Sequence, residues 1–317
     1  MNSFSVSLLL RMGCVCAKES ITVGNRKFYV RSRLGEGGFS FVDLVEDKHS
    51  HKLYALKRVA CHSKEDERVS MQEVEIMRTF DHPNLCACEV SSLVAVNDYA
   101  KSIISEVLIV MPFYRKGTLQ DEIDLMCKKY EHIREDRILR LLRGICEGLR
   151  EMHHFDPPYA HRDMKPANVL LDDTDQPVLM DFGSAAKARV EIKTSADARK
   201  LQDIAAEKCT MPFRPPELFQ VQSFTKIDER VDIWSLGCTL YSLAFLESPF
   251  EQVYQRGDSL ALAAIGGNIK YPNSHIYSEE LINLIRCMLV VDLEQRPFID
   301  TVIQHVDNLL IAMENRI

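Results

Sequence analysis

One stretch, residues 159–183, constrains this chain more than any other part of the sequence. Asp163, Lys165 and Asn168 fall within six residues, just before an apolar run, and Asp181 follows a second short apolar run. A carboxylate can accept the proton of a hydroxyl, an ammonium can neutralise a phosphoryl group, and amide and carboxylate oxygens are ligands that suit Mg²⁺. A polar turn before a buried strand explains single members of this set but not the whole. The spacing therefore predicts a phosphoryl-transfer site.

A second signal is the glycine-rich turn between two extended segments, residues 35–42. Backbone without Cβ atoms can approach phosphate closely. Taken alone, such a cluster is more often a simple hairpin turn. Lys57 changes that balance because it ends an apolar strand, where an ammonium is costly to bury without an anion. Glu73, on the following predicted helix, could supply that anion or be an ordinary exposed carboxylate.

Length and composition set the class of protein. A chain of 317 residues favours two domains or lobes, and 46% hydrophobic with 27% charged residues is typical of an ordinary globular protein. The formal net charge of −7 argues against a broad nucleic-acid binder, whose surface would be basic. Ten cysteines without a C-x-x-C pair indicate buried small hydrophobes in a reducing compartment. No apolar run is long enough for a transmembrane segment.

The chain divides into a β-rich front and an α-rich back. Alternating apolar residues predict strands within 27–57. A helix is expected at about 65–80, and apolar residues at three- and four-residue steps predict amphipathic helices at 138–152 and 300–315. Residues 195–209 are also helix-favouring.

These motifs, in this order, resemble those of the eukaryotic protein kinase family: a glycine-rich loop, a strand lysine, a helix glutamate, H-R-D-x-x-x-x-N and D-F-G. Further matches are Pro215-Pro216-Glu217, Asp232-Ile-Trp234 and Arg296, which in the family pairs with the glutamate of the A-P-E motif. More narrowly, the glycine-rich and D-F-G segments look like those of the Numb-associated kinases, and the closest resemblance is to a myristoylated and palmitoylated serine/threonine member.

The resemblance covers about residues 27–313 and implies a bilobal α+β protein kinase fold. Its expected parts are an N-terminal tail of residues 1–26, an N-lobe of 27–111, a hinge of 112–117 and a C-lobe of 118–313. ATP and Mg²⁺ would be the cofactors, and proteins the substrates.

Carried over by position, the resemblance makes Asp163 the catalytic base, Lys165 the phosphate clamp, and Asn168 and Asp181 the magnesium ligands. Thr210 stands where serine/threonine kinases keep a threonine that approaches Asp163 and Lys165, which favours Ser/Thr substrates. The residues expected around ATP include the adenine-pocket, gatekeeper and hinge positions. They are Leu34, Gly35, Glu36, Gly37, Gly38, Phe39, Ser40, Phe41, Val42, Ala55, Lys57, Glu73, Met111, Phe113, Tyr114 and Asp181.

Two departures from the family pattern are Ser40, in place of the third loop glycine, and Pro215, in place of the alanine of A-P-E. Neither removes a charge or a metal ligand, so phosphate binding should survive. His161, Phe182 and Met77 match internal packing positions. The predicted helix at 195–209 suggests a substrate site that needs no activating phosphate, which makes constitutive activity a hypothesis.

Alternatives to a serine/threonine kinase are a pseudokinase-like membrane scaffold and a dual-specificity kinase that also phosphorylates tyrosine. A scaffold of that kind usually lacks the lysine, the base or a metal ligand, and all are present here.

The N-terminal sequence Met12-Gly13-Cys14-Val15-Cys16 bears on the membrane. If translation begins at Met12, Gly13 becomes available for myristoylation, and Cys14 and Cys16 for palmitoylation. Two lipid anchors give stable attachment where one is marginal; an unmodified tail is the alternative. The resemblance implies a peripheral protein on the cytoplasmic face of internal membranes, Golgi or perinuclear, with some in the cytosol.

Overall fold

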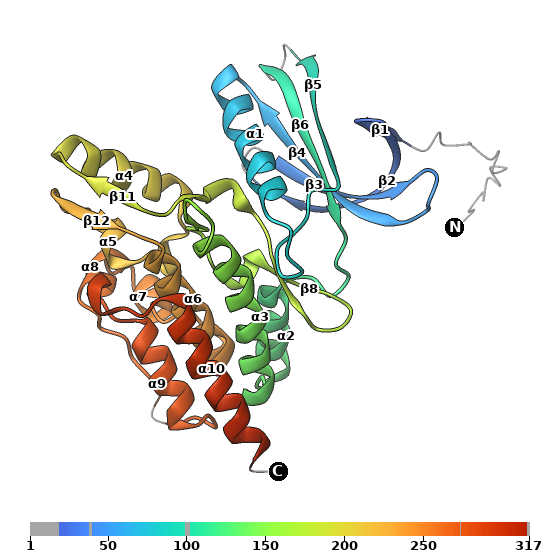
Figure 1. Ribbon diagram of the computed structural model, residues 1–317. Coiled ribbons are helices and arrows are strands. Elements are labelled where there is room, and N and C mark those ends of the chain that lie inside the picture. Colours follow the sequence, from blue (N-terminus) through green and yellow to red (C-terminus); the bar gives the residue numbers. More distant parts are fainter. Residues whose placement is uncertain (1–18, 38–39, 99–101, 273, 316–317) are drawn as a thin grey trace, which may run out of the picture.

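A computed structural model describes residues 19–37, 40–98, 102–272 and 274–315 of the chain (Figure 1). A sheet with one long helix forms the smaller lobe, and helices dominate the larger lobe below it. This arrangement confirms the expected α+β bilobal fold. The predicted acylation segment, residues 12–16, lies outside the described residues.

The smaller lobe is built on a six-stranded antiparallel sheet with the order β1-β2-β3-β4-β6-β5. Alternation of buried and partly exposed residues along these strands matches the period of two that defines a half-buried strand. The strands are β1 (Ser20–Val23), β2 (Arg26–Glu36), β3 (Ser40–Asp47), β4 (Leu53–Cys61), β5 (Val90–Asp98) and β6 (Ile103–Pro112).

Strand β1 lies inside the stretch that was expected to be a tail. It pairs with β2 across a tight turn in which Gly24 has a φ of +58°, a conformation that suits glycine. Val23 is fully buried. The tail therefore ends before Ser20 rather than at residue 26.

Helix α1 (Lys64–Thr79) packs on β4 and β6 and carries Glu73. Ser63 and Asp66 form a capping box at its first turn, with Ser63 Oγ accepting from Asp66 N and Asp66 accepting from Ser63 N. Val74 and Met77 bury its inner face. The helix expected at about 65–80 is thereby confirmed.

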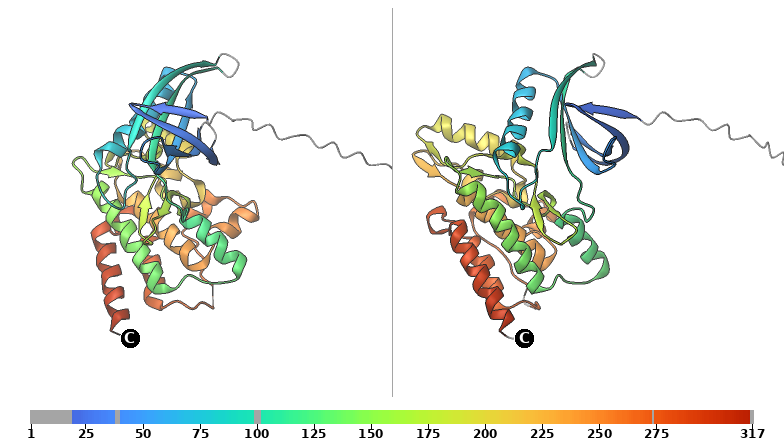
Figure 2. Two further views of the ribbon diagram at one scale, coloured as in Figure 1. Left: turned by 90° about the vertical axis from the view of Figure 1, so that its right-hand side faces the viewer. Right: turned by 45° about the vertical axis from the view of Figure 1, so that its right-hand side comes forward.

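The larger lobe centres on α6 (Arg230–Phe245), which is buried along almost its whole length. Around it lie α2 (Leu119–Lys129), α3 (Glu135–His153), α9 (Glu279–Met288) and α10 (Ile299–Glu314). Figure 2 shows α10 on the outside of this lobe, beside α3, and the two helices are in contact. The amphipathic helices predicted at 138–152 and 300–315 are both confirmed.

Several short elements lie in the larger lobe, where it faces the sheet and beyond. The hairpin of β8 (Val169–Leu171) and β9 (Pro177–Leu179) lies beneath the sheet, flanked by the 3-10 turns η1 (Pro166–Asn168) and η2 (Phe182–Ser184). Helix α4 (Ser195–Lys208) follows and confirms the helix expected at 195–209. The remaining elements are β7 (Tyr159–Ala160), β10 (Ala186–Lys187), β11 (Val190–Ile192), η3 (Met211–Phe213), α5 (Pro216–Phe219), β12 (Thr225–Ile227), α7 (Glu251–Gln255), α8 (Leu260–Ile265) and η4 (Leu293–Gln295).

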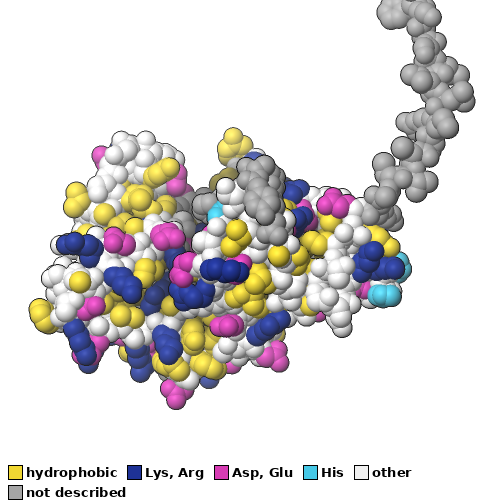
Figure 3. All heavy atoms as spheres, turned by 90° about the horizontal axis from the view of Figure 1, so that it is seen from above, with side chains coloured by type: hydrophobic (Ala, Val, Ile, Leu, Met, Phe, Trp, Pro, Cys, Tyr) yellow, Lys and Arg dark blue, Asp and Glu magenta, His cyan; other side chains and the backbone are white. Residues whose placement is uncertain are grey.

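Across the residues that are described, no helix is both long and apolar enough to span a membrane. On the face seen from above, Lys and Arg side chains are interspersed with Asp and Glu (Figure 3).

Candidate active site

A cavity of about 560 Å³ lies between the sheet and the β8–β9 hairpin. Val42 and Ala55 line it from the smaller lobe, and Leu170 and Met180 line it from the larger one. Most of the residues expected around ATP are there. They are Leu34, Gly35, Glu36, Gly37, Ser40, Val42, Ala55, Lys57, Glu73, Met111, Phe113, Tyr114 and Asp181.

Phe41 is described but does not line the cavity, contrary to its expected role beside ATP. Successive side chains of a strand point to opposite faces, so when Val42 faces the cavity its neighbour Phe41 faces away. Gly38 and Phe39 lie outside the described residues.

Five residues that line the same cavity were missed by sequence reasoning: Cys86, Thr118, Asp121, Leu170 and Met180. Pro112, Arg115 and Gly117 also line it; they lie in the expected hinge but were not named as nucleotide contacts. Leu170 and Met180 lie within the motif segments, beside Asn168 and Asp181, so position alone could have indicated them. Cys86 gave no such signal. It was expected only as a buried small hydrophobe, and it is indeed 2% exposed.

Lys57 forms the buried charge centre of the cavity. Its Nζ donates to Glu73 Oε1 at 2.7 Å and Oε2 at 3.0 Å, and to Asp181 Oδ1 at 3.1 Å. Burial lowers the pKa of Lys57, but the two carboxylates outweigh burial and hold that pKa above its ordinary value. Burial acts to raise the pKa of Asp181, and Lys57 holds it below its usual range. The lysine is therefore a fixed cation at neutral pH.

Asp163, Lys165, Asn168 and Thr210 meet just outside this charge centre. Lys165 Nζ donates to Asp163 Oδ2 at 2.7 Å and lies 2.6 Å from Thr210 Oγ1. Asn168 Nδ2 donates to Asp163 Oδ2 at 3.0 Å, and Thr210 N donates to Asp163 Oδ1 at 2.8 Å. The expected approach of Thr210 to Asp163 and Lys165 is thus present. Both oxygens of the Asp163 carboxylate are held in place.

The backbone that carries these groups is held by Asp232, a fully buried carboxylate on α6. Asp232 accepts from the amides of His161 and Arg162, both at 2.7 Å, and lies 2.9 Å from His153 Nε2. Burial would raise the pKa of Asp232, but these hydrogen bonds hold it below its ordinary value. They also stabilise the φ of +66° at Arg162, which costs energy for a residue with a Cβ.

A short packing and hydrogen-bond chain joins Asn168 to Asp181. Met180 N donates to Asn168 O at 2.9 Å, and His161 Nε2 lies 3.0 Å from Met180 O. The rings of His161 and Phe182 lie 5.5 Å apart. Asp181 itself has a φ of +64°. The two expected metal ligands are therefore presented from adjacent, internally braced turns.

Helix α4 is fastened to the turn that follows Asp181. Ser184 Oγ donates to Lys208 O at 2.8 Å, and Lys208 Nζ donates to Gly183 O at 3.2 Å. Arg162 Nη2 donates to Lys187 O at 2.8 Å. Hydrogen bonds within the protein thus hold α4 to this turn, and the Arg162 guanidinium has a backbone carbonyl as its partner.

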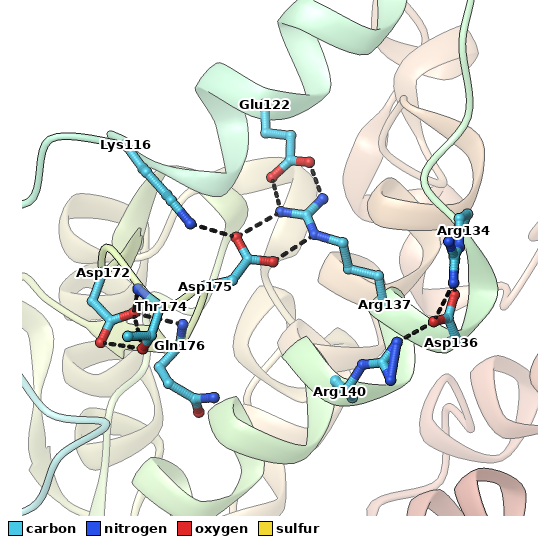
Figure 4. A network of polar contacts seen from close by, with 10 residues as sticks. All are labelled: Lys116, Glu122, Arg134, Asp136, Arg137, Arg140, Asp172, Thr174, Asp175 and Gln176. Atoms are coloured by element: carbon cyan, nitrogen blue, oxygen red, sulfur yellow. Dashed lines mark hydrogen bonds and ion pairs between the residues drawn. The ribbon is translucent and has the colours of Figure 1, made fainter. Parts of the chain in front are cut away.

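A polar network braces the hinge side of the cavity (Figure 4). Arg137, on α3, donates to Asp175 Oδ2 at 2.6 Å and also pairs with Glu122 of α2. Lys116, in the expected hinge, donates to Asp175 Oδ1 at 3.2 Å. Asp175 lies in the turn between β8 and β9, so one carboxylate links the hinge, α3 and that hairpin.

Comparison with known proteins gives a consistent match. The protein kinase domain family matches residues 28–306. Serine/threonine-protein kinase 16 of Rattus norvegicus is 43% identical over 296 residues, covering 93% of this chain and 94% of its own length. The human protein of that name is equally similar. Serine/threonine-protein kinase ppk13 of Schizosaccharomyces pombe is 33% identical, covering 90% of this chain and 92% of its own. With this geometry and these matches, the chain belongs to the protein kinase family.

Proposed function

We propose that this protein transfers the γ-phosphoryl group of ATP, as its magnesium complex, to serine and threonine hydroxyls of proteins, and that it autophosphorylates. The observation that carries the proposal is the arrangement of Asp163, Lys165 and Thr210 around one point outside the nucleotide cavity. The names of its relatives, which are serine/threonine kinases, support the same substrate class.

The residues present suit each part of this reaction. The substrate hydroxyl oxygen bonds to the γ-phosphorus, the bond from that phosphorus to the β–γ bridging oxygen breaks, and ADP leaves. Asp163 accepts the hydroxyl proton. Lys57 holds the α- and β-phosphates, and Lys165 neutralises charge on the transferring group.

Asn168 and Asp181 would hold Mg²⁺. Asn168 Nδ2 donates to Asp163, which leaves the Oδ1 oxygen of the same amide as an acceptor, and the Asp181 side chain is 43% exposed. In the described part of the chain, no group of three or more His, Cys, Asp or Glu side chains is arranged to hold a metal. Mg²⁺ needs few protein ligands, because it is usually bound by one or two carboxylates together with substrate phosphates. The ion would neutralise phosphate charge.

A transfer assay with γ-labelled ATP tests the enzyme directly. We expect Asp163→Asn and Asp181→Asn to remove almost all labelling of a protein substrate, while Asp173→Asn, an exposed neighbour in the same segment, leaves it unchanged. Equal label with wild type and with both site variants would refute the enzyme and favour the pseudokinase-like scaffold.

Phosphoamino-acid analysis of the autophosphorylated protein addresses the dual-specificity alternative. We expect phosphoserine and phosphothreonine. Phosphotyrosine as a major product would show that Thr210 does not restrict the acceptor.

Constitutive activity is supported by the hydrogen bond from Arg162 to Lys187 O and by the fastening of α4. We expect the enzyme to keep its activity after phosphatase treatment, because Arg162 already has a protein partner. Loss of activity on dephosphorylation, regained on rephosphorylation, would contradict this.

Membrane attachment through lipids on Gly13, Cys14 and Cys16 is proposed from the sequence motif and the family resemblance, and residence on Golgi or perinuclear membranes from the resemblance alone. Intact mass of protein from its native cells would distinguish a form that starts at myristoylated Gly13 from one that starts at Met1. Detection of only the unacylated Met1 form would refute the lipid tether.

A further inference from the structure

Phe41 has an unexpected environment for a residue in the glycine-rich segment. Its ring lies away from the nucleotide cavity, between two arginines from the neighbouring strands. Arg33 Cζ, on β2, is 3.9 Å from the ring centroid, and Arg58 Cζ, on β4, is 4.6 Å from it. Both distances are within the range of cation–π attraction.

The pairing of the strands explains why these side chains meet. Phe41 of β3 stands directly opposite Glu36 of β2 on one side and opposite Arg58 of β4 on the other. Cross-strand neighbours of this kind are the side chains that interact most strongly within a sheet.

Carboxylates on the same side of the sheet hold both arginines in place. Arg33 donates to Asp43 Oδ1 at 2.6 Å and to Glu36 Oε1 at 2.6 Å. Arg58 makes bonds of 2.8 and 3.1 Å to the two oxygens of Glu106. Asp43 is only 3% exposed, and a buried carboxylate is costly unless cations pair with it. The arginines are therefore held in place beside it.

On both sides of the Phe41 ring, this cluster adjoins residues that line the nucleotide cavity. Glu36 is itself part of the glycine-rich turn, and the turn is closed by a hydrogen bond of 2.6 Å from Gly37 N to Ser40 O. Phe41 follows Ser40 directly. Arg58 follows Lys57 on β4, whose register partner on β3 is Val42.

We propose that Arg33, Phe41 and Arg58 form an arginine clamp that positions Glu36, Gly37 and Ser40, the described flanks of the glycine-rich turn, relative to Lys57. The three are positioning residues, since none lines the cavity. The proposal rests on the function proposed above, because it assigns the clamp to ATP binding. Its physical basis is pre-organisation: a turn held in the binding conformation loses less freedom when the phosphates arrive.

Phe41→Ala in the full chain is the main test. We expect the KM for ATP and the Kd for Mg-ADP to rise about fivefold, with kcat within about twofold of wild type, because the ring steadies ground state and transition state alike. Phe41→Tyr keeps a ring between the arginines and should restore wild-type values. Arg33→Gln, a second variant, should reproduce the loss in nucleotide affinity.

Arg31→Ala is the matched control. Arg31 is also on β2 and pairs with a β3 carboxylate, Glu46, which lies near the end of β3 away from the turn. It should leave nucleotide affinity unchanged, and thermal melting of every variant checks folding. Wild-type affinity in a folded Phe41→Ala variant, or an equal loss in Arg31→Ala, would overturn the clamp.

Failure of the proposed function would look different. If wild type transfers no phosphoryl group but Phe41→Ala weakens Mg-ADP binding while Arg31→Ala does not, the clamp stands and the kinase assignment falls. If wild type is active and Phe41→Ala binds Mg-ADP normally, the clamp alone falls.

Discussion

At the scale of single residues, the pair of Arg296 and Glu217 shows how a distant contact supports the site. Arg296 has no exposed side-chain surface, and its two Nη atoms donate to the Glu217 carboxylate at 2.7 and 3.0 Å. Glu217 lies in the first turn of α5, just after the segment that presents Thr210. If the carboxylate is removed, the guanidinium stays buried, and the cost of taking its charge out of water is no longer offset by the ion pair.

Glu217→Gln is therefore expected to reduce the free energy of unfolding by about 3 kcal/mol, measured by urea denaturation. Arg230 and Glu294 provide the comparison, because that ion pair has a similar length, 3.0 Å, but Glu294 is 73% exposed. Glu294→Gln should cost less than about 1 kcal/mol. Equal losses in the two variants would contradict the argument from burial.

The apolar strand that ends at Lys57 called for an anionic partner, and Glu73 was one candidate for it. The pairing of Arg296 with Glu217 was implied by the resemblance to the kinase family. Neither argument predicts the direction of the Phe41 side chain. The family pattern treats residues 34–42 as one binding loop, whereas strand alternation places Val42 and Phe41 on opposite faces. The two arginines beside Phe41 come from β2 and β4, and the strand register that brings them to Phe41 cannot be read from the sequence.

At the scale of elements, helix α4 depends on its first turn. Thr194 Oγ1 accepts from Asp197 N at 3.1 Å, and Asp197 accepts from Thr194 N at 2.9 Å, so the two residues form a capping box. Only Ala198, Leu201 and Ala205 bury its inner face. With so little apolar burial, the cap contributes a large part of the helix's local stability.

Thr194→Ala should weaken α4 by about 1 kcal/mol and lower the hydrogen-exchange protection of its amides about fivefold. Thr194→Ser keeps the hydroxyl and should retain most of the protection. Amides of α1, which has its own capping box, serve as the internal reference. Unchanged protection across α4 in the alanine variant would show that contacts with the rest of the lobe, rather than the cap, hold the helix.

The network in Figure 4 joins elements instead of stabilising one. The Arg137 guanidinium lowers the pKa of Asp175 to about 2, with Lys116 assisting and burial opposing. Since an unfolded aspartate titrates near 4, this carboxylate stabilises the fold above about pH 4 and loses that contribution as pH falls towards 2.

Asp175→Asn should cost about 1 kcal/mol at pH 7, a modest value because the Asp175 side chain is 35% exposed and screened by solvent. Urea denaturation at pH 7 and pH 5 should give the same penalty, and the penalty should shrink only below about pH 4. A penalty that has already vanished at pH 5 would contradict the depressed pKa.

Periodicity located the long helices because each buries one face, but it missed β1. Ser20 to Val23 is too short to show a pattern, and its strand character depends on pairing with β2. Short strands of this kind are defined by their partner, so they appear only once the sheet is assembled.

At the scale of the whole molecule, the resemblance carried by the motifs implied the two-lobed α+β fold, whereas the net charge of −7 predicted nothing about the cleft. There the cations Lys57 and Lys165 are each bound to carboxylates. The charge that a nucleotide meets is thus a local balance. This local charge depends on which carboxylates the fold places beside each lysine, and it cannot be calculated from the amino-acid composition.

Because the cavity is lined from both lobes, a nucleotide that fills it should stabilise the molecule as a whole. A ligand at one hundred times its Kd adds about 2.7 kcal/mol to the free energy of unfolding. For a chain of this size we expect saturating Mg-ADP to raise the melting temperature by about 5 °C in differential scanning fluorimetry. Asp181→Asn should lose most of this shift in the presence of Mg²⁺, because the metal loses its carboxylate, while Asp173→Asn keeps it. Equal shifts in both variants would mean that Asp181 does not take part in binding the metal–nucleotide complex.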